Sequence, residues 1–290
     1  MNMTDEEEKM LELMSELEGY TRLGEPCKKE KIDIWKAAIG LQQTDGLLPS
    51  AYLIETAKQN IDGYITFSEV KARLDDYYKT RTARSEGRVE EADKVAARIA
   101  EIISEKAFNF SMSGYILLHK KLFAGIYNFA GEIRDYNITK AEWILGGDTV
   151  HYADTDDIRT LLWQEFEEEK AFKYKGLTRK EIAEHIAKFI SGLWKIHPFG
   201  EGNTRTTAVF AIKYMRTLGF DVTNDLFAEH SWYFRNALVR ANYNDLKNNI
   251  YATNEYLDRF FDNLILGEKN VLKNREMHVA AEHKAQEKRE

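Results

Sequence analysis

The scarcity of proline is the feature that most constrains how this chain can fold. Only Pro26, Pro49 and Pro198 occur in 290 residues, so long helices can run without interruption. Apolar residues recur at spacings of three and four, which is typical of amphipathic helices. We predict helices over residues 1–19, 31–44, 50–61, 67–78, 82–107, 111–126, 156–170, 179–196, 204–218, 230–241 and 253–266.

Local signals mark where several of these helices begin and end. Asp45-Gly46 is a stop signal because glycine accepts the backbone angles that follow a helix. Pro49-Ser50 is a start signal, and Asp62-Gly63 ends the same helix. Thr66 and Glu69 have the spacing of a capping box, which predicts a helix that starts after Thr66.

Two short runs of β-prone residues interrupt this helical pattern. Residues 137–140 (Asn-Ile-Thr-Lys) and 149–152 (Thr-Val-His-Tyr) flank the glycine pair Gly146-Gly147. Such runs around a glycine turn predict a β-hairpin. The expected fold is therefore all-α with a small β-hairpin. We divide it into an N-terminal helical module (1–80), a main domain (81–267) and a charged tail (268–290).

Composition excludes several classes of protein. The net charge of −7 argues against a nucleic-acid partner, since phosphate backbones attract basic surfaces. No run of 18 apolar residues occurs, so we predict no membrane span. The acidic N-terminus does not resemble a signal peptide, and the single Cys27 fits a reducing compartment, so we expect a cytoplasmic protein. The apolar residues would suit a homo-oligomer interface as well as a core.

The segment from His197 to Thr207 holds the residues that indicate chemistry. Pro198 should end the preceding helix at His197, and the next helix should begin near Thr204. Free N–H groups at a helix start attract anions. His197, Glu201 and Arg205 then supply a base, a metal ligand and a cation, which together suit phosphate transfer.

This segment resembles the Fic family signature His-x-Phe-x-(Asp/Glu)-Gly-Asn-Gly-Arg-x-x-Arg. Matching positions are His197, Phe199, Glu201, Gly202, Asn203 and Arg205. Residues 129–134 (Phe-Ala-Gly-Glu-Ile-Arg) and 137–140 also resemble the family segment that leads into its target-docking flap. The similarity extends over about residues 105–265.

The resemblance implies a role for each matching residue. His197 would deprotonate a hydroxyl of a target protein, and Glu201 would hold Mg²⁺. The nucleotide ATP would be bound by Phe199, Gly202, Asn203, Thr204 and Arg205, with Phe199 anchoring the loop. Ile138, Thr139 and Lys140 would form the flap on which the target docks by adding a strand.

Two positions depart from the signature. Thr204 replaces its second glycine, and Ala208 replaces the last arginine, which in the family contacts the outer phosphate of ATP. Arg235 and Arg240 are candidates to replace that cation. The resemblance implies transfer of AMP from ATP to a Ser, Thr or Tyr hydroxyl of a target protein, and the two departures leave two alternatives to it. One is phosphate transfer from the same donor, and the other is a non-catalytic module that binds nucleotide or protein.

The N-terminal module resembles the antitoxin of some bacterial Fic toxins, which implies a toxin–antitoxin origin. That antitoxin inhibits through Ser/Thr-x-x-x-Glu-Gly, whose glutamate pairs with the last signature arginine. Here Leu41 and Asp45-Gly46 align with the motif, and the arginine is Ala208. We therefore expect a structural or regulatory cover that no longer inhibits through that ion pair.

Overall fold

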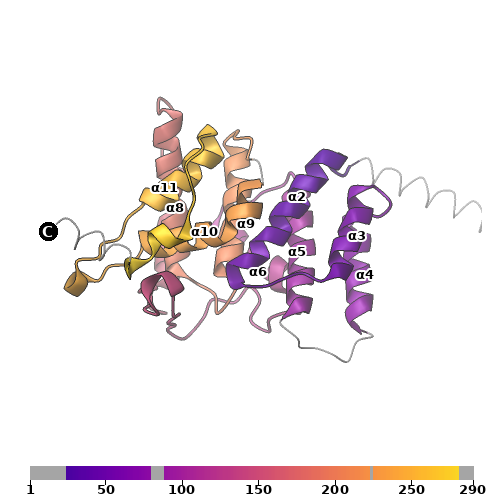
Figure 1. Ribbon diagram of the computed structural model, residues 1–290, viewed down its shortest axis with the longest axis horizontal. Coiled ribbons are helices and arrows are strands. Elements are labelled where there is room, and N and C mark those ends of the chain that lie inside the picture. Colours follow the sequence, from indigo (N-terminus) through magenta and orange to yellow (C-terminus); the bar gives the residue numbers. More distant parts are fainter. Residues whose placement is uncertain (1–23, 80–87, 223–224, 281–290) are drawn as a thin grey trace, which may run out of the picture.

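All regular elements in the described part of the chain are helices. The computed structural model describes residues 24–79, 88–222 and 225–280 (Figure 1). The α-helices are α2 (Lys28–Gly40), α3 (Ala51–Ile61), α4 (Phe67–Lys79), α5 (Val89–Ser104), α6 (Met112–Phe123), α7 (Ile158–Ala171), α8 (Arg179–Ile196), α9 (Asn203–Thr217), α10 (Asp225–Ala241) and α11 (Glu255–Phe261). The short helical segments are η1 (Leu41–Asp45), η2 (Trp143–Leu145), η3 (Leu246–Asn248), η4 (Asp262–Leu266) and η5 (Asn274–Met277).

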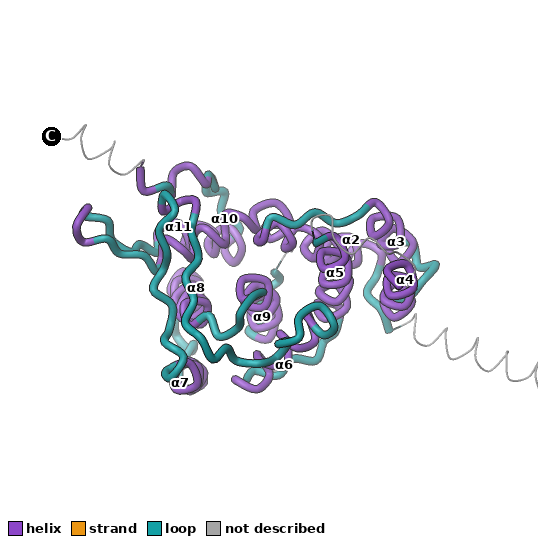
Figure 2. Tube along the Cα trace, turned by 90° about the horizontal axis from the view of Figure 1, so that it is seen from below, coloured by secondary structure: helices purple, strands orange, loops and turns teal. Residues whose placement is uncertain are grey.

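Helix α9 occupies the centre of the molecule. Every residue from Asn203 to Met215 is buried, because α5, α6, α8 and η1 surround the helix (Figure 2). On one side α2 packs against both α5 and α10, and α3 and α4 lie beyond α5. Trp35 of α2 and Leu41 of η1 belong to the common core. The start of α9 is therefore enclosed by helices from both ends of the chain.

The predicted helix signals are confirmed where the structure describes them. Ser50 caps α3 by accepting a 3.1 Å hydrogen bond from the N–H of Leu53. Thr66 and Glu69 form the capping box of α4, with main-chain to side-chain bonds of 3.2 and 2.6 Å. The predicted helix over 1–19 lies outside the described residues. None of the described helices has both the length and the apolar character needed to cross a bilayer.

The predicted β-hairpin was wrong. In the described residues of this region the chain forms an ordered loop with a 3₁₀ turn at η2. Glu142 donates its N–H to the carbonyl of Asp148 at 2.8 Å, but Lys140 donates its N–H to the side chain of Thr149, which prevents a ladder from continuing. Burial of Ile144 and Val150 fixes the loop to the core. A lone two-stranded hairpin is only marginally stable, so these side-chain contacts decide the conformation.

Candidate active site

His197 stands at the end of α8 in a left-handed backbone conformation. Its φ and ψ are 50° and 58°, which for a residue with a Cβ costs about 1–2 kcal/mol. The strained turn is held by Arg134, whose Nε donates to the carbonyl of His197 at 2.8 Å. The N–H of Arg134 also donates to the carbonyl of Pro198 at 2.9 Å. Arg134 thus fixes the backbone of this turn and, with it, the orientation of the His197 side chain.

The imidazole of His197 is buried and keeps one nitrogen without a partner. Its Nδ1 lies 3.3 Å from the carbonyl of Trp194, which can only accept, so Nδ1 carries the proton. The ring lies 4.1 Å from that of Tyr152, and no described group bonds to Nε2. Burial, followed by the charge of Lys140, lowers the pKa of His197 well below its usual value. The side chain is therefore a neutral imidazole whose buried Nε2 lone pair has no hydrogen-bond partner among the described residues.

The loop after His197 is folded back on itself by its own side chains. Asn203 accepts from the N–H of Phe199 at 3.0 Å and donates to its carbonyl at 2.7 Å. Phe199 is fully buried and stacks on His119 at 3.7 Å, so it anchors the loop. Thr204 accepts from the indole N–H of Trp194 at 2.9 Å. The side chains of Asn203 and Thr204 therefore shape the loop. The first main-chain N–H groups of α9 have no partner within the helix, and such groups can receive an anion.

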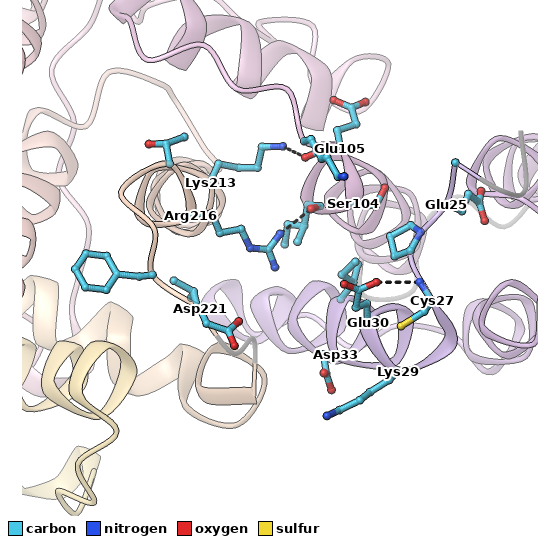
Figure 3. Close-up of a pocket in the computed structure, with 18 of the residues that line it drawn as sticks. Glu25, Cys27, Lys29, Glu30, Asp33, Ser104, Glu105, Lys213, Arg216 and Asp221 are labelled. Atoms are coloured by element: carbon cyan, nitrogen blue, oxygen red, sulfur yellow. Dashed lines mark hydrogen bonds between the residues drawn. The ribbon is translucent and has the colours of Figure 1, made fainter.

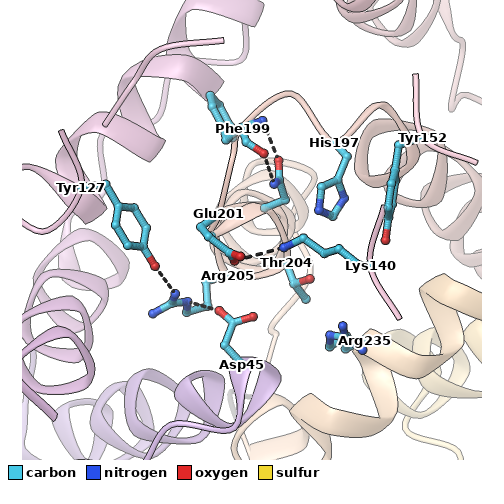
Figure 4. A network of polar contacts seen from close by, with 12 residues as sticks. Asp45, Tyr127, Lys140, Tyr152, His197, Phe199, Glu201, Thr204, Arg205 and Arg235 are labelled. Atoms are coloured by element: carbon cyan, nitrogen blue, oxygen red, sulfur yellow. Dashed lines mark hydrogen bonds and ion pairs between the residues drawn. The ribbon is translucent and has the colours of Figure 1, made fainter. Parts of the chain in front are cut away.

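Glu201 and Lys140 form an ion pair at the opening beside His197. Their side chains lie 3.0 Å apart, joining residues 61 positions apart in sequence (Figure 4). The carboxylate of Glu201 is 41% exposed, whereas the main-chain carbonyl of Glu201 is held by His119 Nε2 at 3.0 Å. Lys140 thus points into the site, while its neighbours Ile138 and Thr139 lie at the surface, half-buried and exposed respectively.

Arg205 occupies a different environment from the one expected of a phosphate ligand. Its guanidinium is fully buried and makes ion pairs of 2.7 Å with both Asp45 and Glu91. Gln42 accepts a further hydrogen bond at 3.1 Å, and the group lies 4.8 Å above the ring of Phe123. Asp45 therefore does contact the signature segment, but its partner is Arg205 and not the residue at position 208. The guanidinium of Arg205 is therefore already engaged by protein groups.

Comparison with known proteins places this site in a family. Residues 109–215 match the model of the Fic/DOC family, and this range includes the whole loop from His197 to Arg205.

Residues 109–215 are a Fic/DOC domain.

Similar proteins come from Bartonella. The chain is 28% identical over 139 residues to protein adenylyltransferase VbhT of Bartonella schoenbuchensis. The aligned residues make up 46% of this chain and 28% of that protein's length. Among solved structures it is similar to BepC of Bartonella tribocorum with bound AMPPNP (22% identity, TM-score 0.48, 60% of this chain and 83% of that one). It is also similar to the FIC domain of Bep8 from Bartonella sp. 1-1C (19% identity, TM-score 0.48, 63% and 88%).

Several residues that build the site in this Fic domain escaped the sequence prediction. His119 connects α6 to the signature loop, since it also accepts the N–H of Gly131 at 2.9 Å. Tyr152 covers one face of the imidazole of His197. Arg134 was part of the segment that resembles the flap, but its contact with His197 was not foreseen. A spacing rule cannot find these residues because each acts from a separate segment.

A separate cleft lies at the opposite end of α9 from the signature. It measures about 1270 Å³ and is bordered by the start of α2 and the ends of α5 and α9 (Figure 3). Two of its cations serve the fold, because Lys213 and Arg216 donate to the carbonyls of Ile102 and Ile103 at 2.9 and 2.8 Å. Positive groups at a helix end compensate its unpaired carbonyls.

Proposed function

We propose that this protein is an adenylyltransferase that moves AMP from ATP to a Ser, Thr or Tyr hydroxyl of a target protein. The observation that carries the proposal is the buried, unprotonated Nε2 of His197, which has no partner among the described residues and lies beside the start of α9. A purely structural histidine has its second nitrogen satisfied, because an orphaned buried polar atom is costly. Similarity to a protein adenylyltransferase is consistent with this activity.

The chemistry follows from the free lone pair. Nε2 of His197 takes the proton of the target hydroxyl, and the oxygen attacks the α-phosphorus of ATP. A bond forms between that oxygen and the α-phosphorus, while the bond between the α-phosphorus and the bridging oxygen breaks. Pyrophosphate leaves with the electron pair. The lowered pKa keeps His197 in its basic form at neutral pH, and the protonated ring remains held by the carbonyl of Trp194.

ATP and Mg²⁺ fit the groups around this histidine. The N–H groups at the start of α9 would receive phosphate oxygens, and Gly202, with φ of 78°, lets the backbone approach them closely. Glu201 is the partly exposed carboxylate that would hold Mg²⁺, since magnesium in nucleotide sites needs few protein carboxylates beside the phosphates. When bound, the ion neutralises phosphate charge. Lys140 must then leave Glu201 or turn toward a phosphate.

The target would dock on the exposed segment Ile138–Lys140. No hydrogen bond of the described residues uses the main chain of Ile138 or Thr139, so these groups are available to a partner strand. Strand addition would position a hydroxyl without demanding a particular sequence. Because Lys140 joins this segment to Glu201, a docked target would lie close to the nucleotide.

A second candidate is transfer of the γ-phosphate. It is favoured by Ala208, which is fully buried and lacks any group that could orient the outer phosphates. A donor bound in the reverse sense would present its γ-phosphorus to the hydroxyl. A module that only binds nucleotide or protein is the third candidate, and the free base at His197 argues against it.

One experiment separates these candidates. The protein is incubated with a bacterial lysate and ATP labelled on either the α- or the γ-phosphate. We expect label in protein from the α-position only, and about 10²–10⁴-fold less with His197→Ala at an unchanged melting temperature. Label from the γ-position alone would establish phosphotransfer, and no label from either would leave a binding module. Transfer by the His197→Ala variant at the wild-type rate would refute the assigned base.

A further inference from the structure

The signature helix leaves the outer phosphates of a nucleotide without a free arginine. Ala208 carries no polar group, and Arg205 is engaged with Asp45 and Glu91 at 2.7 Å. A triphosphate carries several negative charges, which Lys140 and the start of α9 would compensate only partly. A cation from another element is therefore required if the site holds the whole triphosphate.

Arg235 of α10 approaches the same opening from the far side (Figure 4). Its guanidinium makes a two-pronged ion pair with Glu142, at 2.6 and 3.0 Å. Glu142 is also bonded by the hydroxyl of Tyr152 at 3.4 Å, and Tyr152 lies against the imidazole of His197. Arg235 is thus connected to the catalytic histidine through two intervening side chains.

The pair of Arg235 with Glu142 preorganises the guanidinium for binding a phosphate. Glu142 is almost fully buried, whereas the side chain of Arg235 keeps 15% of its surface exposed. A guanidinium has five N–H donors, and a two-pronged carboxylate contact uses only two of them. The ring of Trp232, at 5.1 Å, supports its face. The guanidinium is therefore fixed in orientation while donors remain for a second anion.

We propose that Arg235 binds the outer phosphates of the nucleotide and that Glu142 orients it for this purpose. The inference rests on the proposed nucleotide site, and it names the residue that replaces the missing signature arginine. Arg235 would fix which phosphorus faces His197, so it would determine the group that is transferred. Its partner Glu142 is a positioning residue that does not touch the nucleotide.

The test must separate a phosphate ligand from a partner that merely neutralises Glu142. Arg235→Met alone would leave a buried carboxylate unpaired and could unfold the protein. The double variant Arg235→Met/Glu142→Gln removes both charges and keeps the volumes. The control is Arg259→Met, because Arg259 is likewise an ion-paired arginine, bonded to Glu255 and Glu276 away from the site. Thermal melts establish that each variant is folded.

Binding of AMPPNP and AMP is then measured by titration calorimetry in Mg²⁺, without any target. We expect the double variant to bind AMPPNP about 10–100-fold more weakly, while AMP changes less than about twofold. Wild-type affinity for AMPPNP in the double variant would overturn the proposal, because Arg235 would then serve Glu142 alone. Equal losses for AMP and AMPPNP would overturn it as well. If wild-type protein binds neither nucleotide, the proposed function itself fails.

Discussion

Asp45 restrains Arg205, and releasing it should lower stability while raising nucleotide affinity. The change we consider is Asp45→Asn, which keeps the shape of the side chain and removes its charge. Asp45 lies 2.7 Å from Nε of Arg205, and the guanidinium has no exposed surface. Loss of a buried partner costs about 3–5 kcal/mol when the remaining charge is left uncompensated. Here Glu91 and Gln42 still accept from Arg205.

The cost should therefore be nearer to that of one charged hydrogen bond, about 1.5–3 kcal/mol. For a chain of this size that corresponds to a melting temperature lower by roughly 3–12 °C. The same loss frees one edge of Arg205 and removes a negative charge from the phosphate region. We expect the affinity for AMPPNP to rise about tenfold, since a new charged contact is worth a similar free energy.

Melting temperature and calorimetric titration check both effects in the full chain. Deleting the N-terminal module would be a poorer assay, because α2 packs against α5 and α10 and its removal would expose the core. The control is Asp62→Asn, whose pair with Lys28 is exposed and screened by solvent, so its loss should change the melting temperature little. A lower melting temperature with unchanged affinity for AMPPNP would show that Arg205 is only a structural tie.

Two further predictions concern the loop and its support. Gly202→Ala should destabilise the protein more than Gly63→Ala and should abolish AMPPNP binding. Both glycines have φ near 80°, but only at position 202 would a Cβ meet a ring, that of Phe123, at 2.4 Å. Equal melting temperatures of the two variants would contradict this steric account. Burial lowers the pKa of His119 to about 4 from 6.5, so the unfolded chain binds more protons between these pH values. Stability should fall as pH drops below 6.5, by about 2 kcal/mol at pH 5 from this group, and the fall should be smaller by that amount in His119→Gln. Denaturant unfolding of both proteins at pH 7 and pH 5 measures this fall in stability. An equal fall in the wild type and in His119→Gln would refute the assignment.

The sequence by itself determined most of the described helices and several of their ends. Ser50, Thr66 and Glu69 form their caps through hydrogen bonds to residues three positions away, so their neighbours in sequence suffice. The same holds for the signature loop, which Asn203 closes onto Phe199 within four residues. Local bonds of this kind depend little on the rest of the fold.

Only the tertiary structure decided which charges meet in the site. The pairs of Lys140 with Glu201, Arg235 with Glu142 and Asp45 with Arg205 each join distant segments, and their formation depends on how helices pack. The segment at 137–152 followed the same rule, because side-chain contacts overrode its β-prone sequence. Hydrophobic periodicity specifies which face of a helix is buried. It does not specify which helix covers that face, and the electrostatics of this site depend on that choice.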